Sequence, residues 1–298
     1  MSRSYVDSCP MTVYNLPDGD TFNVLLTGDP DFVVEFAGVL DRNNVPFSIL
    51  PSLDEFDELD VELELADRWT EDVRIQAAEF GAYADRVAID LRSIAPTVTH
   101  IVDLSISSNP DRRITLEYVS SVNHRATVIT SVLTNTATEI GMFANIPTRI
   151  CGVTLLPGVM STATAVDMCS GMNTLPHHTA SALALLRSLG YSVEQVEDRV
   201  ALVQVRVLAM LINEAAFAVM EKLASPEDID SAMTLGVNYP KGLLRWADEI
   251  GIGIITLVLD GLYREYQQER YRPCILLKQM MRAGWIGKAV SRGFFTYT

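Results

Sequence analysis

Lysine is missing from the first 221 residues of this 298-residue chain, and every basic residue before position 200 is arginine. Residues 1–199 carry 28 acidic and 12 basic side chains, whereas residues 200–298 carry 10 acidic and 11 basic ones. Much of the negative charge lies in an acidic segment, residues 51–72, which we interpret as a solvated face. A chain with a net charge of −15 is a poor partner for nucleic acid or for an anionic membrane.

Cysteine is also scarce, and its four positions show no CxxC spacing. Scattered cysteines predict reduced thiols in a cytoplasmic protein and argue against a structural zinc site. No run is apolar enough to span a membrane, because the most apolar one, residues 201–220, contains four polar or charged side chains. The N-terminus lacks the apolar core of a signal peptide. We therefore expect no metal, no membrane span and a cytoplasmic location.

Short β-rich runs alternate with helical ones from Phe22 to about residue 196. The runs expected to be strands include FNVLL, VPFSIL, VAIDL, THIVDLSI, TVITSVL, RICGVTLL and TAVDM. This alternation predicts a parallel sheet covered by helices on both faces.

After Asp198 the pattern becomes almost entirely helical, beginning with an apolar helix over about 202–223. Ser225 is a good N-cap for the next helix, with Pro226 at its first position. We expect an N-terminal extension (1–21), an α/β domain (22–198) and an all-α domain (199–298).

Spaced motifs in the helical part resemble the C-terminal domain of the 3-hydroxyacyl-CoA dehydrogenases. The matching residues are Asn213-Glu214-Ala215, the EDID–AM–LG run from Glu227, Tyr239-Pro240-x-Gly242, Asp248, Tyr271-Arg272-Pro273 and Gly293-Phe294-Phe295. Upstream, TATEIG and RICGVTLLPGV fall where the family has related segments, so the resemblance extends back to Phe22. It implies a Rossmann-type N-terminal domain, a helical domain that forms a homodimer, and an acyl-CoA site in the cleft between the domains.

The resemblance also implies an NAD site on a G-x-G-x-x-G turn, which this chain replaces with Gly28-Asp29-Pro30-Asp31-Phe32-Val33. Only Gly28 is kept. Pro30 removes a backbone N–H, and the two aspartates, which we expect to cap the helix, place negative charge where a pyrophosphate would bind. The acidic residue that would hold the ribose corresponds to Pro51, with Asp54 as a shifted substitute. We therefore expect no cofactor.

The positions that the resemblance implies for catalysis have changed as well. The family's histidine base corresponds to Thr154, its orienting glutamate to Asp167, and a substrate-binding asparagine to Val205. A threonine hydroxyl cannot act as a base near neutral pH. Ser131 and Thr134 lie in the region of the family's substrate-binding serine and are possible substrate contacts. The family's Pro-Gly before the first C-terminal helix is Val200-Ala201 here.

Three hypotheses remain open on the sequence. The first is a non-redox family member that binds an acyl-CoA or similar acyl ligand, or partners an active homologue. The second is an active NAD-dependent 3-hydroxyacyl-CoA oxidoreductase with relocated site residues. The third is other chemistry in the same cleft, because fold does not settle function.

Overall fold

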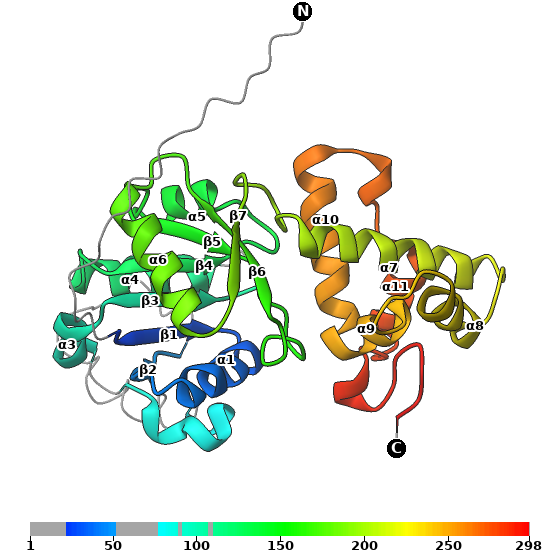
Figure 1. Ribbon diagram of the computed structural model, residues 1–298, viewed down its shortest axis with the longest axis horizontal. Coiled ribbons are helices and arrows are strands. Elements are labelled where there is room, and N and C mark those ends of the chain that lie inside the picture. The colour runs from blue at the N-terminus through cyan, green and yellow to red at the C-terminus, as the bar shows by residue number, and fades with distance from the viewer. Residues whose placement is uncertain (1–21, 52–76, 89–90, 107–109, 298) are drawn as a thin grey trace, which may run out of the picture.

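The computed structural model of the protein describes residues 22–51, 77–88, 91–106 and 110–297. An α/β domain is followed by a helical domain, and the two lie side by side (Figure 1). This confirms the predicted fold class. The N-terminal extension and the acidic segment after Pro51, including Asp54, lie outside the described residues.

A seven-stranded sheet with the order β2-β1-β3-β4-β5-β6-β7 forms the centre of the α/β domain. Its strands are β1 (Val24–Gly28), β2 (Phe47–Ile49), β3 (His100–Leu104), β4 (Thr127–Ser131), β5 (Ile150–Val153), β6 (Ala165–Ser170) and β7 (Ser192–Gln195). Neighbouring strands are parallel except β5 and β6, which are antiparallel. The sheet is therefore mostly parallel, as predicted.

Helices cover both faces of the sheet, as the alternating sequence pattern predicts. One face packs against α1 (Pro30–Arg42) and α6 (Pro176–Ser188), and the other against α3 (Leu91–Ile94), α4 (Pro110–Val122) and α5 (Ala137–Phe143). Side chains of successive residues in a strand point to opposite faces of the sheet. In β1, Leu26 therefore packs in the core on the α1 side, and Leu25 packs in the second core, on the α4 side.

One of the strand predictions is wrong. The run VAIDL, residues 87–91, does not form a strand in its described residues: Val87 makes an isolated bridge with Ile49, and Leu91 begins α3. It follows a 3-10 segment, Ala78–Arg86, in which Gly81 has a φ of 54°. Burial explains the apolar pattern of the run, since Leu91 lies in the second core.

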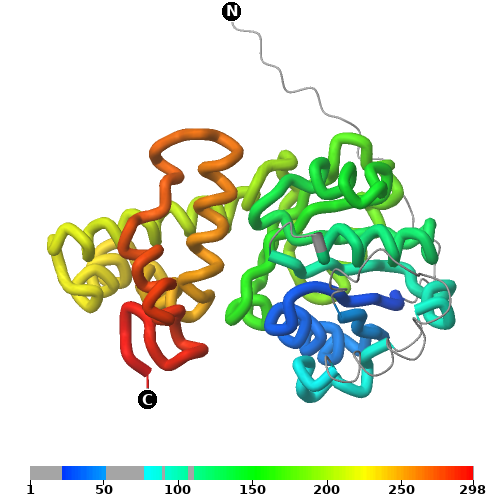
Figure 2. Tube along the Cα trace, turned by 180° about the vertical axis from the view of Figure 1, so that it is seen from behind, coloured from blue at the N-terminus to red at the C-terminus, as the bar shows by residue number. Residues whose placement is uncertain are grey.

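The helical domain begins with α7 (Gln204–Met220), shorter at both ends than expected. It continues with α8 (Pro226–Ser231), a π-helical turn (Ala232–Gly236), α9 (Leu243–Ile250), α10 (Ile252–Tyr266), the 3-10 turn Glu269–Tyr271, α11 (Ile275–Arg282) and the 3-10 turn Lys288–Val290. The Ser225 side chain accepts the Asp228 N–H, which confirms it as the N-cap of α8. The chain passes between the domains once, just before α7, as Figure 2 shows from behind.

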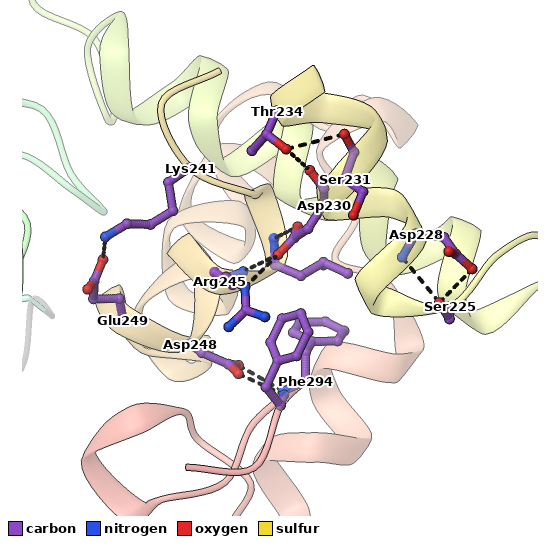
Figure 3. Close-up of polar contacts among 12 residues, drawn as sticks. Ser225, Asp228, Asp230, Ser231, Thr234, Lys241, Arg245, Asp248, Glu249 and Phe294 are labelled. Atoms are coloured by element: carbon purple, nitrogen blue, oxygen red, sulfur yellow. Dashed lines mark hydrogen bonds and ion pairs between the residues drawn. The ribbon is translucent and has the colours of Figure 1, made fainter. Parts of the chain in front are cut away.

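Two buried aspartates explain several of the motif residues that resemble the family in this domain (Figure 3). Asp230 accepts the N–H groups of Leu244 and Arg245 at the start of α9, and a Cβ at Gly242 would overlap its carboxylate. Asp248 accepts the N–H groups of Phe294 and Phe295 at 2.8 and 2.9 Å. Buried carboxylates need several hydrogen-bond donors. Because these donors come from other segments of the chain, the two aspartates hold the helical domain together.

Candidate functional site at the carboxyl edge of the sheet

The sheet has its topological switch point between β1 and β3, because the chain leaves β1 for β2 on one side and returns to β3 on the other. Open α/β sheets bind ligands just outside the carboxyl ends of the strands at such a point. Here those ends are Gly28 and Leu104, which are register partners.

Gly28 is required by the packing of these two strands. Its φ is 120°, and a Cβ there would lie 2.5 Å from the Leu104 carbonyl carbon and from the Ser105 nitrogen. Only glycine fits such a close backbone approach. The one glycine kept from the dinucleotide motif thus has a role in the sheet itself, whether or not a nucleotide binds.

The Asp29 side chain bridges the switch point. Its carboxylate accepts the Ile106 N–H at 2.7 Å, from the loop that follows β3. Asp29 occupies the N-cap position of α1, as expected, but its side chain makes no capping hydrogen bond to the helix. Burial, with a smaller contribution from the nearby Asp103 carboxylate, raises the pKa of Asp29.

The remaining residues of the turn also fail to fit a pyrophosphate. Pro30 is the first residue of α1 and has no N–H to offer. Val33, at the third glycine position, is fully buried in the apolar core. With the Asp29 carboxylate on the Ile106 N–H, the residues at this turn do not fit NAD.

A buried ion pair lies beside the switch point and was not expected from the sequence. The Arg112 Nε donates to Asp103 at 2.8 Å, and both side chains are completely buried. The Thr130 hydroxyl donates to Asp103 and accepts from Arg112, which also donates to the Ser131 carbonyl at 2.6 Å. The only sequence signal was an aspartate inside the apolar run HIVDLSI.

The serine and threonine candidates, at the end of β4 and in the segment that follows it, differ in their surroundings. Ser131 is buried, and within the described residues its hydroxyl has no hydrogen-bond partner. Thr134 is part of the contact between the domains: its hydroxyl donates to the Ile106 carbonyl, and its own carbonyl accepts from Arg264 of α10 at 2.7 Å. Gly261 of α10 packs on the Thr134 backbone, where a Cβ would lie 3.0 Å from its Cα.

Thr154, Asp167 and Val205 come together where β5, β6 and α7 meet. The Thr154 N–H reaches the Asp167 carbonyl at 3.5 Å, and its buried hydroxyl has no partner among the described residues. The Asp167 carboxylate accepts the N–H groups of Val203 and Gln204 at 3.0 and 2.6 Å, at the start of α7. Val205 is buried in the apolar core. The Asp167 carboxylate therefore binds the N–H groups at the start of α7, and no histidine lies beside it.

All four histidines of the chain lie within the described residues, and none is at the carboxyl edge of the sheet. His100 begins β3, and His178 contacts Thr127, the first residue of β4, at 2.8 Å through Nδ1. His177 is stacked on His178, and His124 lies in the turn before β4. Since β3 and β4 are parallel, these residues gather at the amino edge of the sheet. The described residues also contain no group of three His, Cys, Asp or Glu that could hold a metal.

Comparison with known proteins connects this arrangement to one family. Residues 203–297 match the 3-hydroxyacyl-CoA dehydrogenase C-terminal domain. The probable 3-hydroxybutyryl-CoA dehydrogenase of Bacillus subtilis (strain 168) is 36% identical over 160 residues, covering 54% of this chain and 55% of that protein. The helical domain is therefore a 3-hydroxyacyl-CoA dehydrogenase C-terminal domain, and the chain is similar to dehydrogenases of this family.

Similarity to this family is uneven along the chain. The 3-hydroxyadipyl-CoA dehydrogenase of Escherichia coli (strain K12) is 45% identical over 101 residues, which cover 34% of this chain and 21% of that protein. The alignments thus span about half of the first relative and about a fifth of the second. The solved (S)-3-hydroxybutyryl-CoA dehydrogenase of Ralstonia eutropha superposes with a TM-score of 0.72, covering 94% of this chain and 100% of that one at 23% identity, which shows a shared fold.

In the described part of the chain, no helix combines the length and apolarity that a membrane crossing requires.

Proposed function

We propose that this family member is non-redox and does not use NAD. The observation that carries the proposal is the hydrogen bond from the Ile106 N–H to the Asp29 carboxylate, which puts a negative charge at the switch point. A pyrophosphate would have to bind beside that charge, at a turn where Pro30 has no N–H. The position of all four histidines at the other edge supports the proposal, because oxidation of a 3-hydroxyl, in which the hydride leaves C3, needs a base within reach of the hydroxyl proton.

We further propose that the site between the domains holds an acyl-CoA or a similar acyl ligand. The buried hydroxyls of Ser131 and Thr154 have no partner in the described structure and would contact the polar end of the acyl group. Val205, in place of asparagine, favours an apolar chain over a hydroxylated one, because an apolar side chain leaves a ligand hydroxyl without a partner.

A titration followed by tryptophan fluorescence tests this binding. Butyryl-CoA should give a saturable change that free CoA does not give, and 3-hydroxybutyryl-CoA should bind several-fold more weakly. The variant Val205→Asn should reduce or reverse that preference, whereas Val203→Asn, at an exposed position two residues earlier, should leave it unchanged. Equal binding of free CoA and both esters would contradict an acyl site.

The helical domain is proposed to form a homodimer, or to pair with an active homologue. Of the large apolar side chains exposed in the described structure, most belong to this domain: Val203, Val207, Met220, Leu223, Leu235, Val237, Leu257, Ile275, Trp285, Ile286 and Val290. A concentration of exposed apolar side chains in one domain favours a protein–protein contact. Sedimentation should give twice the chain mass of 32.9 kDa at micromolar concentration, and a monomer would contradict the homodimer.

The alternative function is NAD-dependent 3-hydroxyacyl-CoA oxidoreduction with relocated site residues. It is favoured by the names of the relatives, which are dehydrogenases. Other chemistry at the same site has no specific residue in its favour. Binding of NADH separates the alternative from the main proposal.

A further inference from the structure

The segment that joins the two domains contains a strained backbone. Ala201 and Leu202 have φ values of 59° and 41°, so two successive residues with a Cβ lie in the left-handed region. This region is unfavourable for such residues, and strained positions persist only where surrounding contacts enforce them. The family resemblance places a glycine at position 201, so the strain at that residue comes from the alanine of this chain.

Contacts from the α/β domain hold this segment in place. The Ala201 N–H donates to the Val132 carbonyl at 2.8 Å, and both Ala201 and Leu202 are buried. The next two residues, Val203 and Gln204, donate their N–H groups to one oxygen of Asp167. The other Asp167 oxygen accepts from the Gln204 side chain at 3.2 Å. A single carboxylate therefore ties the end of the strained segment to β6.

Within the described residues, the chain crosses from one domain to the other once, through this same segment. Contacts beyond it also join the domains: Arg264 donates to the Thr134 carbonyl, Gly261 packs on the Thr134 backbone, and Gly158 lies against the Glu249 backbone, where a Cβ would be 2.9 Å from the carbonyl oxygen. Thr154 and Val205 are both buried near this segment.

We propose that residues 199–203 are a strained hinge between the domains, and that the Asp167 carboxylate is the latch that keeps the hinge closed. Asp167 occupies the position that corresponds to the family's orienting glutamate, and here it controls domain position instead. The inference does not depend on which ligand the protein binds, because it concerns the hinge in the free protein.

Hydrogen exchange at single amides of the full-length chain tests the latch. In Asp167→Ala, the amides of Val203, Gln204 and Arg206 should exchange at least tenfold faster, and small-angle scattering should show a longer maximum dimension. Thr136→Ala is the matched control, because it removes the N-cap of α5 in the same domain. It should release the Glu139 amide and leave the hinge amides unchanged.

Glycine at position 201 provides the second test, since it adopts a positive φ without strain. Adding Ala201→Gly to Asp167→Ala should slow hinge exchange again by about fivefold, as glycine favours the closed form without the latch. Ala201→Gly alone should slow exchange at the same amides, a result available even if Asp167→Ala does not fold. Hinge amides that are unaffected in Asp167→Ala, or that exchange faster in Ala201→Gly, would overturn the proposal.

Discussion

The Asp29 carboxylate and the Ile106 backbone N–H lie 2.7 Å apart across the switch point of the sheet. This hydrogen bond joins the turn after β1 to the loop after β3, the two segments between which an open α/β sheet binds its ligand. The acid thus uses a backbone donor at the place where a dinucleotide-binding protein offers donors to phosphate. The proposed loss of NAD binding rests on this contact and on the missing glycines.

Substitutions at Asp29 separate the hydrogen bond from the charge. Asp29→Ala removes the partner of the Ile106 N–H and should lower the free energy of unfolding by about 1–2 kcal/mol. Asp29→Asn keeps a hydrogen-bond acceptor without the charge and should change the free energy of unfolding by less than about 0.5 kcal/mol. Asp31→Asn, exposed in the same helical turn, is the control for an altered helix terminus.

The pH dependence of these variants has a definite sign. Burial raises the pKa of Asp29 above its ordinary 3.8, so at pH values between 3.8 and the raised pKa the folded protein holds a proton that the unfolded chain has released. This contribution to stability is greatest at low pH and is lost as the pH rises through the raised pKa. Urea denaturation at several pH values should show the effect in the wild type and not in Asp29→Asn. The same slope in both proteins would contradict the assignment to Asp29.

The Asp103–Arg112 ion pair should be costly to break from one side. Arg112→Met leaves a buried carboxylate without its cation and should destabilise the fold by about 3–5 kcal/mol. Adding Asp103→Leu should recover part of that loss, because no unpaired charge remains. Arg113→Met is the neighbouring control: its ion pair with Glu117 is exposed, and its loss should cost less than about 0.5 kcal/mol. Equal effects of Arg112→Met and Arg113→Met would contradict this account.

The sequence predicted the fold because its signals are local. Strand and helix periodicity and the Ser225 cap act over short distances along the chain. The antiparallel β5–β6 pair and the partner of Asp29 could not be predicted in this way. They depend on segments that meet only in the folded protein, as Asp29 and Ile106 do across 77 residues. The departures from the family pattern at Thr154 and Val205 were visible in the sequence, whereas the contact of Asp167 with the start of α7 was not.

Acidification should destabilise the protein through His178. Burial, together with the nearby His177, Arg149 and His100, lowers the pKa of His178 from 6.5 to about 4. Between these values the unfolded chain binds a proton that the folded protein does not, so stability falls as the pH drops from 6.5 to about 4. The slope should approach about 1.4 kcal/mol per pH unit. His178→Gln should remove this contribution, while His124→Gln, at an exposed position, should keep it.

Restoring a histidine at position 154 should not restore a dehydrogenase. Thr154→His supplies the imidazole, yet the Asp167 carboxylate remains bound to the N–H groups of Val203 and Gln204, and the turn at Gly28 is unchanged. We expect no NADH-dependent reduction of acetoacetyl-CoA above the wild-type background, with Thr154→Val as the matched variant. A general base is worth about a hundred- to ten-thousandfold in rate, so a gain of that size would show that only the base had been lost.

Titration of the wild-type protein with NADH, followed by addition of acetoacetyl-CoA, tests whether the protein binds the cofactor and acts as a dehydrogenase. Loss of two or three charge-assisted hydrogen bonds at about 1.5–3 kcal/mol each predicts binding weaker by about a thousandfold or more. We therefore expect no saturable NADH binding at micromolar concentrations and no fall in nicotinamide absorbance after the substrate is added. Saturable NADH binding with turnover on the order of 1 per second or faster would contradict the account and establish an active dehydrogenase.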